Sequence, residues 1–384
     1  MEEKNIKEIE IIKLIKQVNK NKKKIELHPP TVGKWETYEV LKAIKTKSIS
    51  TYGKTTSLFE KKISKITKSK FVVALNSGTS ALQLSIIAAG VRSNEEVLIP
   101  ALNFIASTNS VIYNNSIPHF IESDNNLGID ISKLDKYLSL ISSVKNNTCY
   151  NKITKRIIKA IIPTHVFGHV SNMGDLLKLC KKYKLLLIED ASEALGTYYK
   201  NKHAGTFGKI GVLSFNGNKI MTTGAGGAVI TNSKHLADRV RFLSTTSKSL
   251  EKNNLIYNEV GYNYKMPSLN AAMGIGQLKK FKEIKQNKKI LFKKYAKTFA
   301  NYQNIEVIKS PKYCESNFWL NAIKLKNINF SKLFDIAKKE NIQIRQIWSL
   351  INLGKAYRQY PKMKLNISTK LSKSIICIPS GIIK

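Results

Sequence analysis

The residue best placed for chemistry in this chain is a lysine in a glycine-rich connection, Lys219, within the stretch Ser214–Gly227. Apolar runs at Gly211–Phe215 and Gly227–Thr231 predict buried strands on either side of it. Such a position suits imine chemistry, because burial and neighbouring cations expose the lone pair of a lysine amine. In a chain with 64 basic residues, a solvated loop lysine is the competing interpretation, and this stretch alone favours it.

A second candidate is Asn76–Ser80, which joins the apolar run Phe71–Leu75 to an expected helix over Thr79–Ala89. Free backbone amides and the helix dipole make such an N-terminus a phosphate site, and the hydroxyls of Thr79 and Ser80 add donors. An ordinary helix cap fits the same residues equally well. The glycine spacing matches neither a Walker loop nor a dinucleotide-binding turn.

Three more residues follow predicted strands. Asp190 ends an apolar run, where a carboxylate is costly unless it is paired or functional, so it could hold a protonated ring nitrogen or a metal, or cap a turn. Phe104 could stack on a flat ligand or belong to the core. His165 could be a polar site residue or a structural histidine.

Taken together, these residues describe one kind of site. A phosphate cradle, an aromatic ring, an acid and then a lysine 219 − 190 = 29 residues later occur in this order. Pyridoxal phosphate requires a phosphate anchor, a ring contact, an acid that keeps the pyridinium protonated and a Schiff-base lysine. The sequence therefore predicts a pyridoxal phosphate site around Lys219.

The elements that must position this site alternate regularly between strand and helix, which predicts an α/β fold with a mostly parallel sheet covered on both faces. Ligands of such sheets bind beyond the carboxyl ends of the strands, where these motifs fall. The predicted strands are Phe71–Leu75, Glu96–Pro100, Ile117–Ile121, Ile157–Pro163, Lys184–Ile188, Gly211–Phe215 and Gly227–Thr231. The predicted helices between them include Thr79–Ala89, Ile105–Tyr113, Asn172–Tyr183 and Ser233–Leu243.

Three regions are expected along the chain. Residues 1–30 form a helical extension with apolar positions at every third residue from Ile6 to Val18, ended by His28–Pro30. Residues 31–255 form the large cofactor-binding domain. Residues 256–384 form a smaller α+β domain that opens with one long helix, Leu269–Tyr302.

Composition narrows the class of protein. The formal charge is +38, yet only six of the basic residues are arginine, the residue that phosphate and base readout favour, so we expect no nucleic-acid partner. The four cysteines contain no Cys-x-x-Cys pair, so neither a metal site nor a disulfide is expected. The start lacks signal-peptide features and no apolar run approaches membrane-spanning length, so we expect a cytoplasmic protein without a membrane partner.

With these motifs in place, the chain resembles the DegT/DnrJ/StrS family of pyridoxal-phosphate sugar aminotransferases, most closely the branch named for legionaminic acid biosynthesis. The resemblance runs from about Ser50 almost to the C-terminus. It is carried by Gly53 with Phe59-Glu60, Asn76–Leu82, Glu96–Pro100 with Phe104, Pro163–Gly168, Glu189–Gly196, Ser214–Lys219, Gly224–Gly227 and Gly261–Tyr264.

The resemblance implies a type I aminotransferase fold, working as a homodimer with shared active sites. It implies that Lys219 forms the Schiff base and moves protons, that Asp190 pairs with the pyridine nitrogen and that Glu193 lies near the ring hydroxyl. Phe104 would stack on the ring. The amino group would pass from glutamate to the 4-keto carbon of a nucleotide-linked 4-keto-6-deoxyhexose, for surface polysaccharide or nonulosonic acid biosynthesis.

For the phosphate, the resemblance implies Thr79, Ser80 and Ser214, joined by Asn263 from the neighbouring subunit. For the substrate it suggests His165 and Arg345. A same-fold sugar dehydratase, in which some relatives replace the lysine by histidine, and a non-catalytic regulator are the alternatives.

Three departures from the family pattern stand out. Lys265 replaces an arginine, Leu350–Asn352 lacks a histidine often found there, and the chain stops at Lys384 without the usual terminal helix. None of these positions belongs to the expected cofactor set.

Overall fold

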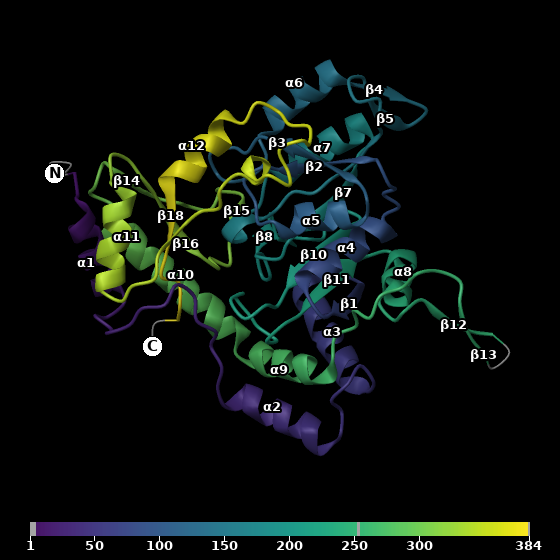
Figure 1. Cartoon of the computed structure of the whole chain (residues 1–384). Helices are drawn as coiled ribbons and strands as arrows, with labels where there is room; N and C mark the ends of the chain where they lie inside the picture. The colour runs from purple at the N-terminus through teal and green to yellow at the C-terminus, as the bar shows by residue number, and fades with distance from the viewer. Residues whose placement is uncertain (1–4, 252–253, 383–384) are drawn as a thin grey trace.

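A seven-stranded sheet forms the centre of the molecule (Figure 1). The structure is a computed structural model that describes residues 5–251 and 254–382. The strands are ordered β1-β11-β10-β7-β6-β2-β3, and β11 runs in the direction opposite to the other six strands. Their bounds are β1 Phe71–Leu75, β2 Glu96–Pro100, β3 Ile117–Ile121, β6 Ile158–Ile161, β7 Leu186–Asp190, β10 Ile210–Ser214 and β11 Gly227–Thr231. The predicted mostly parallel α/β sheet is thus confirmed.

Helices cover both faces of this sheet because the strands are apolar on both sides. They are α3 Lys54–Thr67, α4 Gly78–Ala88, α5 Ala106–Tyr113, α6 Ile131–Ile141, α7 Met173–Tyr183 and α8 Lys234–Leu243. Helix α4 is buried over most of its surface, and the Ser77 hydroxyl caps it by accepting from the Ser80 amide at 3.0 Å. The carboxyl ends of β1, β7 and β10 therefore open at one edge, next to the start of α4.

The C-terminal part forms a second, smaller core. A four-stranded sheet, β14-β16-β18-β17, packs with α11 Phe330–Lys339 and α12 Asn366–Ser374. Its strands are β14 Ile305–Val307, β16 Asn321–Leu325, β17 Arg345–Gln346 and β18 Ile375–Ile378. The long helix predicted here was wrong: the structure has two helices, α9 Ser268–Lys279 and α10 Phe281–Thr298, which meet at Lys280. We keep the three-region division as a proposal.

The N-terminal helix α1, Glu8–Val18, packs on α10 and α11 in this smaller core. The predicted apolar face needs one correction, because Ile9 is 54% exposed and Ile11 is buried in its place. Spacing of three residues drifts around a helix with 3.6 residues per turn, and Ile11 together with Ile15 restores the buried stripe.

A buried carboxylate joins the two cores. Glu122, directly after β3, accepts hydrogen bonds from the backbone amides of Ile367 and Ser368, both at 2.8 Å, in the first turn of α12. A carboxylate stabilises a helix N-terminus because it satisfies free amides and faces the positive end of the dipole. The edge of the large sheet is thereby attached to the smaller unit.

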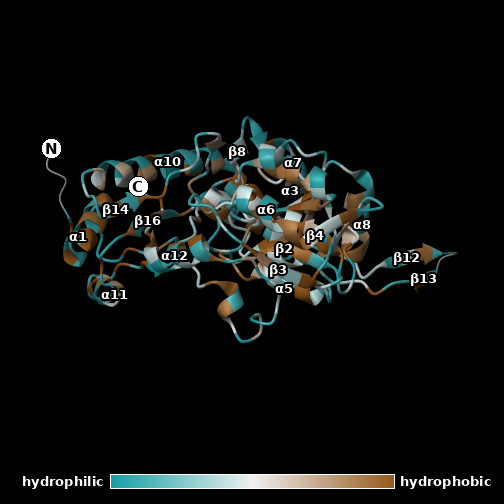
Figure 2. Ribbon diagram, turned by 90° about the horizontal axis from the view of Figure 1, so that it is seen from above, coloured by the Kyte–Doolittle hydropathy of each residue, from teal (hydrophilic) through white to brown (hydrophobic). Residues whose placement is uncertain are grey.

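Two elements stand apart from the cores. Helix α2, Lys34–Lys45, lies on the outside against α9, and the strands β12 Lys248–Glu251 and β13 Asn254–Tyr257 form a hairpin that projects from the body (Figures 1 and 2). The remaining short strands are β4 Ser142–Lys145, β5 Thr148–Asn151, β8 Tyr198–Tyr199, β9 Lys202–His203 and β15 Cys314–Glu315, with 3-10 turns at Val166–Gly168 and Ile351–Leu353. No helix within residues 5–251 and 254–382 is long and apolar enough to cross a membrane.

The buried imidazole of His169 gives the fold a measurable acid sensitivity. Burial lowers the pKa of His169 from 6.5 to about 4. Between pH 6.5 and pH 4, His169 is therefore protonated in the unfolded chain and neutral in the folded chain. Stability must therefore fall as pH drops from 6.5 toward 4. When the pH is lowered from 7 to 5, the free energy of unfolding should fall in both proteins, and the fall should be roughly 2 kcal/mol smaller in His169→Leu than in wild type. Urea titrations at both pH values measure this, and equal losses would contradict it.

Candidate active site

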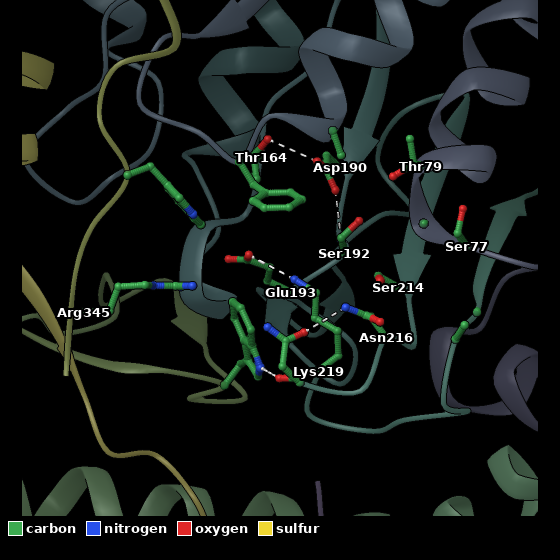
Figure 3. A pocket seen from close by; sticks show the side chains of 18 residues that line it. Ser77, Thr79, Thr164, Asp190, Ser192, Glu193, Ser214, Asn216, Lys219 and Arg345 are labelled. Atoms are coloured by element: carbon green, nitrogen blue, oxygen red, sulfur yellow. Dashed lines mark hydrogen bonds and ion pairs between the residues drawn. The ribbon is translucent and has the colours of Figure 1, made fainter. Parts of the chain in front are cut away.

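A cavity of about 320 Å³ opens at the carboxyl edge of the large sheet (Figure 3). Its wall contains Thr79, Phe104, Asp190, Lys219 and Arg345, which come from five separate parts of the sequence. Lys219 and Arg345 bring positive charge to it, and Asp190 brings a carboxylate. The structure thus brings these residues, which the sequence predicts to form one site, together in one cavity.

One end of the cavity is lined by hydroxyls around the start of α4. Ser77, Thr79, Ser192 and Ser214 all line it, and Figure 3 shows them on the same side of the pocket. Gly78 leaves room there, since a Cβ at this residue would lie 2.9 Å from the Cβ of Ser214 and 3.6 Å from the Ser192 hydroxyl. First-turn amides and convergent hydroxyls form an anion cradle that suits a phosphate group.

A methyl group at Gly78 should damage this cradle and little else. We expect Gly78→Ala to weaken pyridoxal phosphate binding about tenfold, because Ser214 must shift away from the new Cβ, while alanine in a helix does not lower stability. Titration of the apoprotein, followed by cofactor absorbance, measures the dissociation constant. Gly33→Ala is the matched control, because a Cβ at Gly33 meets nothing within 4 Å. Unchanged affinity in Gly78→Ala would contradict the cradle.

Asp190 ends β7 with its carboxylate almost fully buried, at 4% exposed. The Ser107 hydroxyl donates to Oδ2 at 2.6 Å, and the Ser192 amide donates to Oδ1 at 3.1 Å. The Thr164 hydroxyl lies 3.5 Å from Oδ2. These donors orient the carboxylate toward the cavity, where it can accept a hydrogen bond from a protonated ring nitrogen.

The Lys219 amine lies between an acid and an aromatic ring. Its Nζ is 3.2 Å from Oε1 of Glu193 and 4.1 Å from the ring centroid of Trp319. The Lys219 side chain is 11% exposed and reaches the cavity from the loop after β10. Burial raises the pKa of Glu193, and the Lys219 charge and the Phe167 amide oppose that rise.

The mouth of the cavity carries Phe104 and Trp348, whose ring centroids are 6.3 Å apart. Phe104 is 49% exposed, so one part of its ring is free to contact a ligand in the cavity. Arg345, in β17, reaches the cavity from the smaller unit, opposite the hydroxyl cradle in Figure 3. The cavity is thus closed by residues of both cores.

Three predicted site residues lie outside this wall. Ser80 points back into the turn, where its hydroxyl donates to Oδ1 of Asn76 at 2.7 Å. His165 is fully buried and meets Oε2 of Glu189 at 3.0 Å, in a structural contact behind the site. Asn263 is exposed on its own chain, so a role at a shared site would need a second subunit.

Two departures from the family pattern also lie away from the wall. The Lys265 amide donates to the Ser244 carbonyl at 3.2 Å, and residue 265 bridges to Leu75 beside the end of β1. Asn352 is buried at 7% exposed in the 3-10 turn Ile351–Leu353. Neither side chain belongs to the cavity lining.

The structure adds residues that sequence reasoning missed. Trp319 and Trp348 come from the smaller unit, in stretches with no recognisable motif. Ser77, Thr164 and Ser192 lie inside quoted motifs, where strand-end position was the available signal. The register explains how Thr164 reaches the site: its backbone, three residues after the end of β6, forms a parallel bridge with Asp190, the last residue of β7.

The residues present fit pyridoxal phosphate. The hydroxyl cradle at Gly78 suits its phosphate, the buried Asp190 suits its ring nitrogen and the exposed Phe104 offers a stacking face. Lys219 supplies the amine that such a cofactor requires.

Comparison with known proteins agrees with this geometry. The model of the DegT/DnrJ/EryC1/StrS aminotransferase family matches residues 30–382. GDP-perosamine synthase of Escherichia coli O157:H7 is 32% identical over 77% of this chain and 76% of its own. A Campylobacter jejuni UDP-4-amino-4,6-dideoxy-N-acetyl-beta-L-altrosamine transaminase is 34% identical over 74% of this chain and 72% of its own.

The fold is shared with solved structures as well. Helicobacter pylori PseC, an aminotransferase involved in pseudoaminic acid biosynthesis, superimposes with a TM-score of 0.81 over 93% of both chains at 23% identity. The legionaminic branch is not singled out among these relatives and stays a prediction. The chain belongs to the DegT/DnrJ/EryC1/StrS aminotransferase family and is a pyridoxal-phosphate-dependent aminotransferase.

Proposed function

We propose that the protein transfers an amino group from glutamate to the 4-keto carbon of a nucleotide-linked 4-keto-6-deoxyhexose, for surface polysaccharide or nonulosonic acid biosynthesis. The observation that carries this proposal is the single cavity in which Lys219, Asp190 and the hydroxyl cradle converge. Relatives named as perosamine synthases and altrosamine transaminases support the sugar class.

Each residue has a part in the proposed reaction. Ser77, Thr79 and Ser214 bind the cofactor phosphate, and Asp190 keeps the ring nitrogen protonated. The bound cofactor supplies an electron sink for charge at the α-carbon of the amino donor. Lys219 Nζ takes the proton from that α-carbon, as a positioned base does.

The surroundings of Lys219 support this proton transfer. Glu193 accepts from its amine at 3.2 Å and orients it, and the Trp319 ring, 4.1 Å from the amine, limits the access of water to it. Arg345 stands at the mouth, where its guanidinium can pair with an anionic group of the donor or of the nucleotide. We leave His165 out of the substrate contacts because Glu189 already engages its ring.

The test uses purified protein loaded with pyridoxal phosphate. Glutamate is supplied with a panel of UDP-, GDP- and dTDP-linked 4-keto-6-deoxyhexoses, with and without an N-acetyl group, and products are identified by mass spectrometry and NMR. We expect one panel member to gain an amino group at C4 while 2-oxoglutarate forms. Alanine and glutamine as donors control for glutamate. Transamination of simple keto acids without any sugar product would sink the proposal.

We also propose that the protein is a homodimer with shared active sites. Two exposed apolar surfaces support this: the outer face of α2 (Figure 1) and the projecting β12–β13 hairpin (Figure 2). On α2 they include Trp35, Tyr38, Leu41 and Ile44, at 41–57% exposed, and on the hairpin Leu250, Leu255 and Tyr257, at 58–70% exposed. Contiguous apolar surface of this kind marks an interface, and a second copy would bring Asn263 to the site.

Sedimentation velocity tests the dimer. We expect wild type at twice the chain mass, and Tyr38→Glu/Leu41→Glu at the chain mass, because two charges would be buried in the interface. Lys136→Glu, the same charge change at an exposed position of α6 and far from both surfaces in Figure 1, is the control. A wild-type monomer at micromolar concentration would refute the shared site.

A further inference from the structure

Behind the cavity lies a fully buried amine, Lys288, on the inner face of α10, at 1% exposed. Its Nζ donates to the Trp319 carbonyl at 3.1 Å and to the Ser380 carbonyl, and it meets Nε2 of His28. Burying an amine is costly unless its hydrogen bonds are made, and these contacts engage all three. Burial also lowers the pKa of Lys288 well below its ordinary value.

The partners of Lys288 come from three distant parts of the chain. His28 precedes α2, Trp319 precedes β16 and Ser380 follows β18. The Ser380 hydroxyl in turn accepts from the Asn321 amide at 2.7 Å. Lys288 therefore joins both chain ends to the segment that carries Trp319.

Trp319 leads directly to the reactive amine. Its indole Nε1 donates to the Asn218 carbonyl at 2.7 Å, one residue before Lys219, and its ring lies 4.1 Å from Lys219 Nζ. Lys219, His28 and Lys288 also line one small cavity of about 10 Å³, room for about one water molecule. Lys288 thus stands directly behind the residue that we place at the centre of the reaction.

We propose that Lys288 is a positioning residue for transamination, which fixes the Trp319 main chain and, through the indole, the place of the Lys219 amine. This inference rests on the proposed role of Lys219. Lys288 does not line the active-site cavity, so it does not touch a ligand there and acts through Trp319 and the loop at Asn218. A displacement of about 1 Å at a reacting group can lower the rate about 100-fold.

Steady-state kinetics of the holoenzyme give the first test. Lys288→Met keeps length and burial but removes the donors, and we expect kcat to fall about 10- to 100-fold with KM for the amino donor within about threefold. Lys289→Met, the same change at an exposed neighbour on α10, should keep wild-type kcat. A folded Lys288→Met with wild-type kcat would overturn the proposal.

A double-mutant cycle separates positioning from a general loss of structure. If Lys288 acts through Trp319, then Lys288→Met combined with Trp319→Phe should lose no more activity than the worse single variant. If the double variant instead loses activity by the product of the two single-variant factors, the two residues act independently, and the inference is refuted.

A readout on the apoprotein keeps the inference independent of activity. In a Trp35→Phe/Trp348→Phe background, Trp319 is the sole indole, and we expect Lys288→Met to raise its acrylamide quenching severalfold as the ring loosens. If Lys288→Met fails to fold, His28→Gln tests the same cluster, with a smaller rise. Unchanged quenching in the folded variants would overturn the inference. If Lys219→Ala instead retains activity, the proposed function fails, whereas the quenching result does not depend on it.

Discussion

Lys219→Ala should bind little cofactor covalently and lose at least about a thousandfold in transamination rate, the largest effect of any single change in this chain. Among residues 5–251 and 254–382, Lys219 is the only lysine in the cavity wall, and its neighbours Glu193 and Trp319 cannot replace it as a nucleophile. Cofactor absorbance that borohydride bleaches in wild type should be absent in the variant, and tryptic mapping after reduction should place the label on Lys219.

The matched control is Lys209→Ala, which removes an exposed lysine directly before β10, at the end of this strand away from the active site. It should keep wild-type absorbance and rate. If Lys219→Ala turned over at more than about a tenth of the wild-type rate, the assignment of the reactive amine would be wrong.

Asp190→Asn should lower kcat on the order of a thousandfold while the protein still folds and binds cofactor. Asparagine has the same shape, its oxygen can still accept from the Ser192 amide, and its NH2 group can donate to the Ser107 hydroxyl in place of Oδ2, so packing is kept. It carries no charge, however, and cannot hold a protonated ring nitrogen, so the electron sink is weakened. Half-reactions with glutamate in stopped flow measure the step directly.

Ser107→Ala is the control for Asp190. It removes the 2.6 Å hydrogen bond to Oδ2 and leaves the charge, so we expect less than about a tenfold loss. Equal losses in Asp190→Asn and Ser107→Ala would mean that orientation, rather than charge, is what Asp190 supplies.

Much of the large sheet could be predicted because its strands are short apolar runs between glycines and polar turns. Phe71–Leu75, Glu96–Pro100 and Gly227–Thr231 are strands with the predicted bounds. The antiparallel direction of β11 was not predicted. A strand entered by a tight turn runs antiparallel and one entered by a crossover runs parallel, but its residues are apolar in both cases, so the sequence does not distinguish them. Its partners β1 and β10 settle the direction through the register.

The smaller unit was harder to predict, for physical reasons. The break between α9 and α10 falls at Lys280, in a run of good helix formers without proline, so no local signal marks it. Trp319 and Lys288 depend on contacts between residues far apart in sequence, such as Lys288 with Ser380, which periodicity does not report. Strand-end residues of the site were predictable, and the residues behind it were not.

The hydrogen bonds from α12 to Glu122 have a thermodynamic consequence. A helix whose first turn is completed by a carboxylate from the other core cannot melt without exposing that buried carboxylate, and the large sheet cannot open without uncapping the helix. Heating should therefore give one calorimetric transition for both cores, with equal calorimetric and van't Hoff enthalpies per cooperative unit. Glu122→Gln should lower the midpoint of that single transition by a few degrees without splitting it, because Leu371, Ile375 and Cys377 pack in the same core as the large sheet.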